Sequence, residues 1–239
     1  MLTWRELIAS LWRLTLLSSR IIFHRKLLFM GLGITVYYGI LYAFAVFRPG
    51  EGFSTEQALH VLVEIPGTVL AVYLAMDLVA RERDGAALEI LFSTSMSHYG
   101  IWMIRLVAVY AILALTLLAM STAAYFLFAE FPFVRGGLNA WLPAFLLANL
   151  TFFFAVLCRS SNTAGMLALA FILLVLFTWE GLNNTPYFLF LNPFEAPMAT
   201  NDALWGEKVL LNRLGVVGSG VLFVFLGLRR MELRERLLS

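Results

Sequence analysis

The sequence predicts an all-α polytopic membrane protein with six transmembrane helices, an N-terminal interfacial amphipathic helix and both termini in the cytoplasm. Of its 239 residues, 61% are hydrophobic and only 13% are charged, whereas soluble domains are about 45–50% apolar and about 25% charged. The uncharged residues also form runs of about 20, the length that an α-helix needs to cross a bilayer. This composition excludes disulfide scaffolds, disordered tails, nucleic-acid binders and water-soluble enzymes.

The first element in chain order is residues 1–26, which we expect to form an amphipathic helix. At 3.6 residues per turn, Trp4, Leu7 and Leu11 share one face, whereas Arg13 lies on the opposite face. Such a helix lies in the membrane interface with its arginines near anionic headgroups. It would serve either as a topology anchor or as a mechanical link between cytoplasmic partners and the first span.

Six apolar runs are long enough to cross a bilayer and are predicted to be transmembrane helices. They are residues 27–47, 57–80, 106–129, 136–158, 160–179 and 209–228. The second run contains Glu64 and Asp77, and the sixth contains Arg213 near its start. Charged side chains near the end of a span can reach the interface, whereas a central charge costs about 2.5–3.5 kcal/mol. We therefore expect Glu64 to be solvated at the interface; a role for it in a transport pathway is the alternative.

The distribution of lysine and arginine sets the orientation of these spans. With the N-terminus in the cytoplasm, 13 of the 17 lysines and arginines fall on the cytoplasmic side. The four on the outer side are Arg48, Arg135, Lys208 and Arg213. Because cytoplasmic loops are rich in these residues, both termini are predicted to be cytoplasmic and Gly137 to be exposed outside. We expect a multi-pass protein of the inner (plasma) membrane.

The sequence lacks the patterns that indicate catalysis or cofactor binding. Neither of its two lysines follows a glycine, so it contains no phosphate-binding loop of the form G-x-x-x-x-G-K-[ST]. The three histidines, His24, His60 and His98, lack the spacing of zinc ligands. The Gly218-Ser219-Gly220 stretch could suggest a membrane serine protease, but small residues in a span more often allow close helix packing. We therefore expect neither an enzyme nor a cofactor.

The segment between the second and third spans, residues 82–98, is the cytoplasmic stretch best suited to binding a partner. Its first part is charged, Gly85 interrupts it, and a short apolar helix is predicted to follow. The candidate polar contacts are Glu82, Arg83, Asp84 and Glu89, and the candidate apolar anchors are Leu88, Leu91 and Phe92. Such a helix could lie on the membrane or insert its apolar side chains into a groove on a partner, and physical reasoning alone leaves both open.

The same segment resembles the coupling region of the ABC-2 family of ATP-binding-cassette permeases. A Glu-Arg pair is followed by a glycine, a Leu-Glu pair, a leucine and a Thr-x-Met-Ser ending. The matching residues are Glu82, Arg83, Gly85, Leu88, Glu89, Leu91, Thr94, Met96 and Ser97. Two positions depart from the pattern, because Ala87 and Ser95 stand where the family commonly has threonine and proline. The predicted topology is similar to that of the family over the whole chain.

The predicted outer loop, residues 180–208, is too long for a tight turn. It contains prolines and asparagines, such as Pro186 and Asn192, among aromatic residues that include Tyr187 and Phe188. Exposed irregular backbone does not lie in hydrocarbon, so we expect short re-entrant helices here, as in ABC-2 permeases. The alternative is an aromatic belt at the membrane interface.

The resemblance implies that residues 1–239 form a single transmembrane permease domain without a nucleotide site of its own. The implied partners are a separate ATP-binding-cassette ATPase subunit, a second permease chain (the same or homologous) and the lipid bilayer, with no nucleic acid. The apolar spans favour a lipophilic or amphiphilic substrate, and the family implies export. Two alternatives remain: a non-transporting membrane anchor that recruits a cytoplasmic complex, and an intramembrane enzyme.

Overall fold

The computed structural model describes residues 28–47, 54–76, 78, 98–158, 160–182, 185–194 and 202–235. Within these ranges all regular secondary structure is helical, which confirms the predicted all-α class. The elements are a first helix (Leu28–Phe47), α2 (Thr55–Leu59), the π-helix η1 (His60–Glu64), α3 (Ile65–Ala75), α6 (His98–Leu127), α7 (Phe133–Cys158), α8 (Ser161–Phe177), α9 (Trp179–Leu182) and α10 (Asp202–Glu235). The predicted amphipathic helix, residues 1–26, lies outside the described residues.

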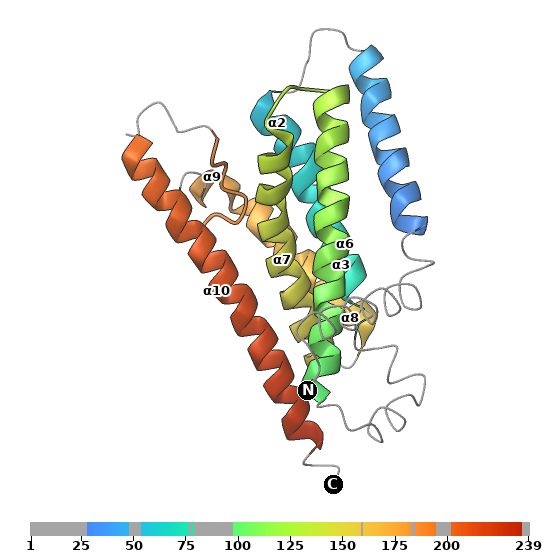
Figure 1. Ribbon diagram of the computed structural model, residues 1–239, viewed down its shortest axis with the longest axis vertical. Helices are drawn as coiled ribbons and strands as arrows, with labels where there is room; N and C mark the ends of the chain where they lie inside the picture. The colour runs from blue at the N-terminus through green and yellow to red at the C-terminus, as the bar shows by residue number, and fades with distance from the viewer. Residues whose placement is uncertain are drawn as a thin grey trace, which may run out of the picture.

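The helices pack around α7, which contacts α3, α6, α8 and α10. Figure 1 shows the first helix and α10 on opposite flanks of the bundle, with α10 inclined away from α7 towards its own start. The short helix α9 lies beside the upper part of α10, at the same end of the bundle as α2 (Figure 1). The starts of α2, α7 and α10 therefore lie at the same end of the bundle.

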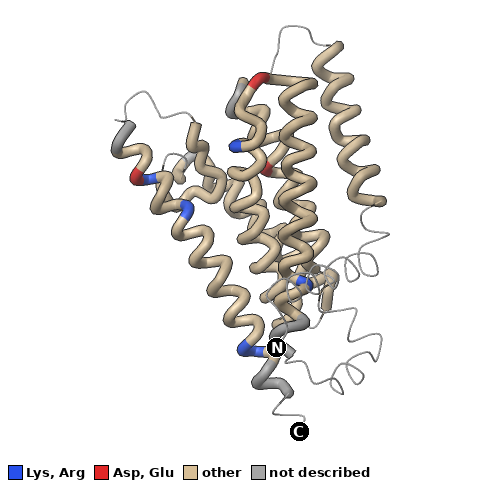
Figure 2. The backbone as a smooth tube through the Cα atoms, in the orientation of Figure 1, with Lys and Arg blue, Asp and Glu red and all other residues tan. Residues whose placement is uncertain are grey.

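Among the described residues, five helices are long and apolar enough to cross a membrane. They are Leu28–Phe47, Gln57–Ala75, Trp102–Leu127, Phe133–Cys158 and Leu204–Met231. The fifth predicted span corresponds to α8, which has 17 residues, or roughly 26 Å of helix. Large apolar side chains remain exposed on the bundle, such as Phe126 at 76% and Phe177 at 88%, and charged residues lie mainly near helix ends (Figure 2). These features fit a multi-pass membrane protein.

Several helices extend beyond the apolar runs that predicted them. α6 begins at His98 instead of residue 106, and α7 begins at Phe133 instead of residue 136. α10 runs from Asp202 to Glu235, whereas the apolar run covers 209–228. An apolar run marks the part of a helix that matches the hydrocarbon, but backbone hydrogen bonding continues into the polar ends.

The predicted outer exposure of Gly137 is wrong. Gly137 lies one turn inside α7 and is buried, and a Cβ on it would lie 3.0 Å from Cδ2 of Leu118 in α6. The error arose because the apolar run starts at residue 136, which placed Gly137 at the end of the span, although α7 starts earlier.

Two glycines of α10 allow it to pack closely against α7. A Cβ on Gly220 would lie 2.5 Å from Cε1 of Phe145, and one on Gly227 would lie 2.8 Å from Cε1 of Phe152. The two glycines are seven residues apart in α10, and the two phenylalanines are seven residues apart in α7. Two aromatic rings of α7 therefore fit against two glycines that are two turns apart on α10. The expectation of close packing in the 218–220 stretch is confirmed for Gly220; a Cβ on Gly218 would meet nothing within 4 Å.

Replacing Gly220 by leucine is therefore expected to destabilise the bundle by about 1–3 kcal/mol, because overpacking forces neighbouring side chains and backbone to move. Unfolding of the purified chain in detergent would measure the change in free energy. The matched control is Gly218→Leu, which meets open space and is expected to change stability by less than about 0.5 kcal/mol. Equal effects of the two substitutions would contradict the packing described here.

Candidate functional site

A π-helix interrupts the second span, and Pro66 explains its position. The N–H of Ile65 donates to the carbonyl of His60, five residues back, which is the π-helical pattern. An N–H at position 66 would bond to Val61 in the π register or to Leu62 in the α register. Proline has no N–H, so neither carbonyl receives this bond from the helix.

Two consecutive tyrosines of the first helix bond to these carbonyls instead. Tyr37 Oη donates to the Val61 carbonyl at 2.7 Å, and Tyr38 Oη donates to the Leu62 carbonyl at 2.8 Å. The Tyr38 hydroxyl also lies 3.0 Å from the carbonyl of Met120 in α6. The missing N–H of Pro66 leaves one backbone carbonyl without a helical donor, which is costly in an apolar interior, and the tyrosine bonds attach the first helix at this point.

Glu64, the last residue of η1, is 2% exposed, and both of its carboxylate oxygens have partners. Oε2 lies 2.9 Å from Nδ1 of His60, and Oε1 accepts a hydrogen bond of 2.7 Å from Nδ2 of Asn139 in α7. The expectation that Glu64 is solvated at an interface is therefore wrong. Its position near the end of an apolar run did not reveal that α7 covers it, and a buried carboxylate is tolerated only when it is paired and hydrogen-bonded.

Arg213 of α10 lies on the other side of Asn139. Its guanidinium donates to Oδ1 of Asn139, to the Leu191 carbonyl at 2.9 Å and to Oδ1 of Asn212 at 3.1 Å. Because arginine can only donate, the amide oxygen of Asn139 faces Arg213 and its NH2 group faces Glu64. One amide therefore connects a buried anion to a cation, an arrangement that we call the Glu64–Asn139–Arg213 chain.

Part of the predicted outer loop, residues 185–194, is held by the same polar cluster, which comprises His60, Glu64, Asn139, Asn212 and Arg213. We call this part of the loop the 185–194 segment. Nδ2 of Asn212 donates to the carbonyl of Pro186 at 3.0 Å and to that of Phe188 at 2.7 Å. The side chains of residues 188–191 are buried. Two neighbouring residues of α10, Asn212 and Arg213, thus bond to three backbone carbonyls of this segment.

His60 joins the cluster to α9 and to the 185–194 segment. Its ring packs edge-on against Trp179, with centroids 4.3 Å apart, and against Phe190, with centroids 5.1 Å apart. The residue is only 8% exposed, and its Nε2 has no hydrogen-bond partner. The imidazole therefore presents one nitrogen to Glu64 while the other lies buried and unpaired.

The cluster can hold paired charges and exchange a proton. Among the described residues, no three His, Cys, Asp or Glu side chains come together to hold a metal ion. Ionisable side chains buried between transmembrane helices are costly and commonly mark functional sites. The cluster joins η1, α7, α10 and the 185–194 segment, so any rearrangement between these elements has to change it.

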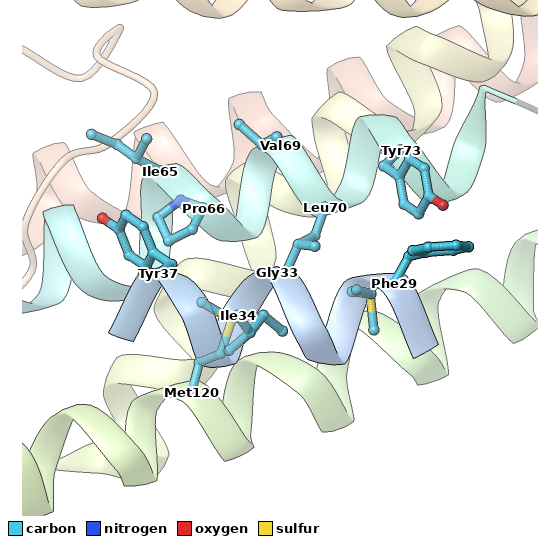
Figure 3. Close-up of a pocket in the computed structure, with 11 residues that line it drawn as sticks. Phe29, Gly33, Ile34, Tyr37, Ile65, Pro66, Val69, Leu70, Tyr73 and Met120 are labelled. Atoms are coloured by element: carbon cyan, nitrogen blue, oxygen red, sulfur yellow. The ribbon is translucent and has the colours of Figure 1, made fainter. Parts of the chain in front are cut away.

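An apolar groove lies between the first helix and α3. Its volume is about 670 Å³, within the range of about 300–1,000 Å³ for ligand sites. Figure 3 shows side chains from both helices lining it, including Phe29 and Tyr37 from the first helix, Pro66 and Tyr73 from α3, and Met120 from α6. Tyr37 and Pro66 belong both to the groove and to the contact between the first helix and η1.

The structure describes only one of the predicted site residues, Glu64. The coupling residues Glu82, Arg83, Asp84, Gly85, Leu88, Glu89, Leu91 and Phe92 all lie outside the described residues. Sequence reasoning did not assign His60, Asn139, Asn212 or Arg213 to a site. The available signal is that each is a polar residue within an apolar run, a few residues from the predicted outer end of that run.

Comparison of the chain with models of known protein families, with curated proteins and with solved structures gives no match.

Proposed function

We propose that the chain is the permease subunit of an ABC-2-type transporter, driven by a separate ATPase subunit and exporting a lipophilic or amphiphilic substrate. The observation that carries this proposal is the coupling motif at residues 82–97, between the second and third predicted spans. The sequence contains no phosphate-binding loop, so the energy for transport would come from the partner that binds this motif.

The described helices support a route by which movement of the coupling segment would reach the opposite end of the bundle. The segment connects the helices that end at Ala75 and begin at His98. The helix ending at Ala75 is continuous with η1, which bonds to the first helix, and Glu64 of η1 bonds to α7. A tilt of the second span would therefore displace the Glu64–Asn139–Arg213 chain, and the bundle would alternate between two arrangements.

The groove between the first helix and α3 supports a lipophilic substrate. Its lining is almost entirely apolar, from Phe29 at one end to Ile65 at the other. An acyl chain or an aromatic ring would match this lining, whereas a hydrated ion would lose its water without gaining polar partners. Two copies of the chain, or one copy and a homologue, would together form the pathway.

Purification of the native complex through a tag on this chain tests the proposal. We expect an ATPase with a phosphate-binding loop to co-purify, and its ATP hydrolysis to change when the two proteins are reconstituted together in liposomes. A co-purifying complex without any ATPase would support the membrane-anchor alternative and contradict the proposal. Hydrolysis of a substrate by the chain alone would support the intramembrane enzyme.

A further inference from the structure

The hydrogen bonds of the His60–Glu64 pair satisfy every N–H group of the pair only while the histidine is neutral. Asn139 donates to one oxygen of the Glu64 carboxylate, and because an ionised carboxylate can only accept, its other oxygen accepts from Nδ1–H of His60 at 2.9 Å. Nε2 of His60 is buried without a partner. With a neutral ring, this nitrogen is an unprotonated acceptor, and every N–H of the pair is satisfied.

A second proton on His60 would change this balance. The imidazolium has N–H donors on both nitrogens, and the new donor at Nε2 would have no acceptor while the ring stays buried. Burial of an unpaired donor is unfavourable, so the protonated ring favours an arrangement in which water reaches it. The rings that cover it, Trp179 and Phe190, belong to α9 and to the 185–194 segment.

The charged neighbours of His60 have opposite effects on an imidazolium, because Glu64 attracts it whereas Arg213 repels it. Glu64 faces His60 from its own helix, and Arg213 faces Glu64 from α10 through Asn139. From the first helix, the phenol hydroxyls of Tyr37 and Tyr38 donate to backbone carbonyls of η1. An imidazolium would place a second cation beside the single carboxylate, and its attraction for Glu64 would compete with that of Arg213, which holds the Leu191 carbonyl.

We propose that His60 and Glu64 form a proton-binding site, and that proton uptake there releases α9 and the 185–194 segment from the bundle. The segment stays packed while His60 is neutral and becomes accessible to water when His60 is protonated. This pH-sensitive contact is a property of the chain itself, so it goes beyond the proposed transport function and needs no ATPase.

Cysteine labelling of the purified full chain in lipid nanodiscs, without nucleotide or ATPase, tests this proposal. In a Cys158→Ala background, Leu191→Cys reports on the segment because Leu191 is 1% exposed. Tyr187→Cys lies in the same segment at 83% exposure and corrects for the effect of pH on thiol reactivity. We expect the ratio of the two labelling rates to be about fivefold or more higher at about pH 5 than at about pH 8.

Three histidine variants separate this site from other effects of pH. His60→Gln keeps a donor for Glu64 but takes up no proton, so the ratio should be independent of pH; His60→Asn is a second variant with the same expectation. His24→Gln is the matched control and should retain the full rise. A constant ratio in the protein with His60, or an equal rise in either His60 variant, would overturn the proposal. Neither result would bear on whether an ATPase binds the chain.

Discussion

Substitution of Arg213 by methionine is expected to destabilise the chain by about 3–5 kcal/mol, because it removes the cation that Asn139 connects to the buried Glu64 carboxylate. Glu64→Gln should have an effect of similar size, since it leaves the Arg213 guanidinium without its counter-ion. The double variant should be close to the original protein in stability, because removing two opposite buried charges together leaves neither without the other. Equilibrium unfolding of the purified chain in detergent would measure the three free energies.

The double-mutant cycle isolates the coupling between the two charges. Two charged residues at the start of α10, Glu207 and Lys208, provide the matched control. Glu207 is exposed and Lys208 is only partly buried, so Glu207→Gln and Lys208→Met should each change stability by less than about 0.5 kcal/mol. Additive effects of the Glu64 and Arg213 substitutions, with the double variant the least stable, would show that the Glu64–Asn139–Arg213 chain does not couple them.

The error about Glu64 shows what an apolar run does and does not reveal. Composition and run length were sufficient to predict helices, because a helix that faces lipid must be apolar along the length of the hydrocarbon. Each apolar run, taken by itself, places its charged residue near a membrane interface, and this holds for both Glu64 and Arg213. Considered together, they are opposite charges a few residues from the same predicted end of their spans, and the high cost of an unpaired charge in lipid would have suggested that they pair.

Local sequence patterns do not predict the π-helix or the tyrosines that bond to it. Pro66 indicates that a backbone bond is lost nearby, but it does not show which of Val61 and Leu62 is left unpaired, or what replaces the bond. The partners, Tyr37 and Tyr38, lie 24 residues earlier in the chain. Their hydroxyls reach η1 only because the first helix packs beside it, and that is a property of the tertiary structure.

Introducing a charge at Leu88 should uncouple the chain from the proposed ATPase partner without unfolding the helices. The coupling segment would place its apolar residues in a cleft of the ATPase, and a buried, unpaired carboxylate in such a cleft costs several kcal/mol. Each loss of about 1.4 kcal/mol weakens binding tenfold. We therefore expect Leu88→Asp either to abolish co-purification of the ATPase or to leave it bound but no longer stimulated, while membrane insertion and thermal stability of the chain remain unchanged.

The matched control for Leu88→Asp is the same charge placed at Ser160, just before α8. The Ser160 hydroxyl accepts a hydrogen bond from the N–H of Thr163 at the start of this helix, and aspartate is an equally good residue at such a position. Ser160→Asp should therefore add a carboxylate at a predicted cytoplasmic loop without loss of stability or of ATPase binding. A segment that only lies on the membrane would predict no specific loss at Leu88. If Leu88→Asp retains insertion, ATPase binding and full transport, residues 82–97 are not the coupling element, and the proposed permease function loses the observation that carries it.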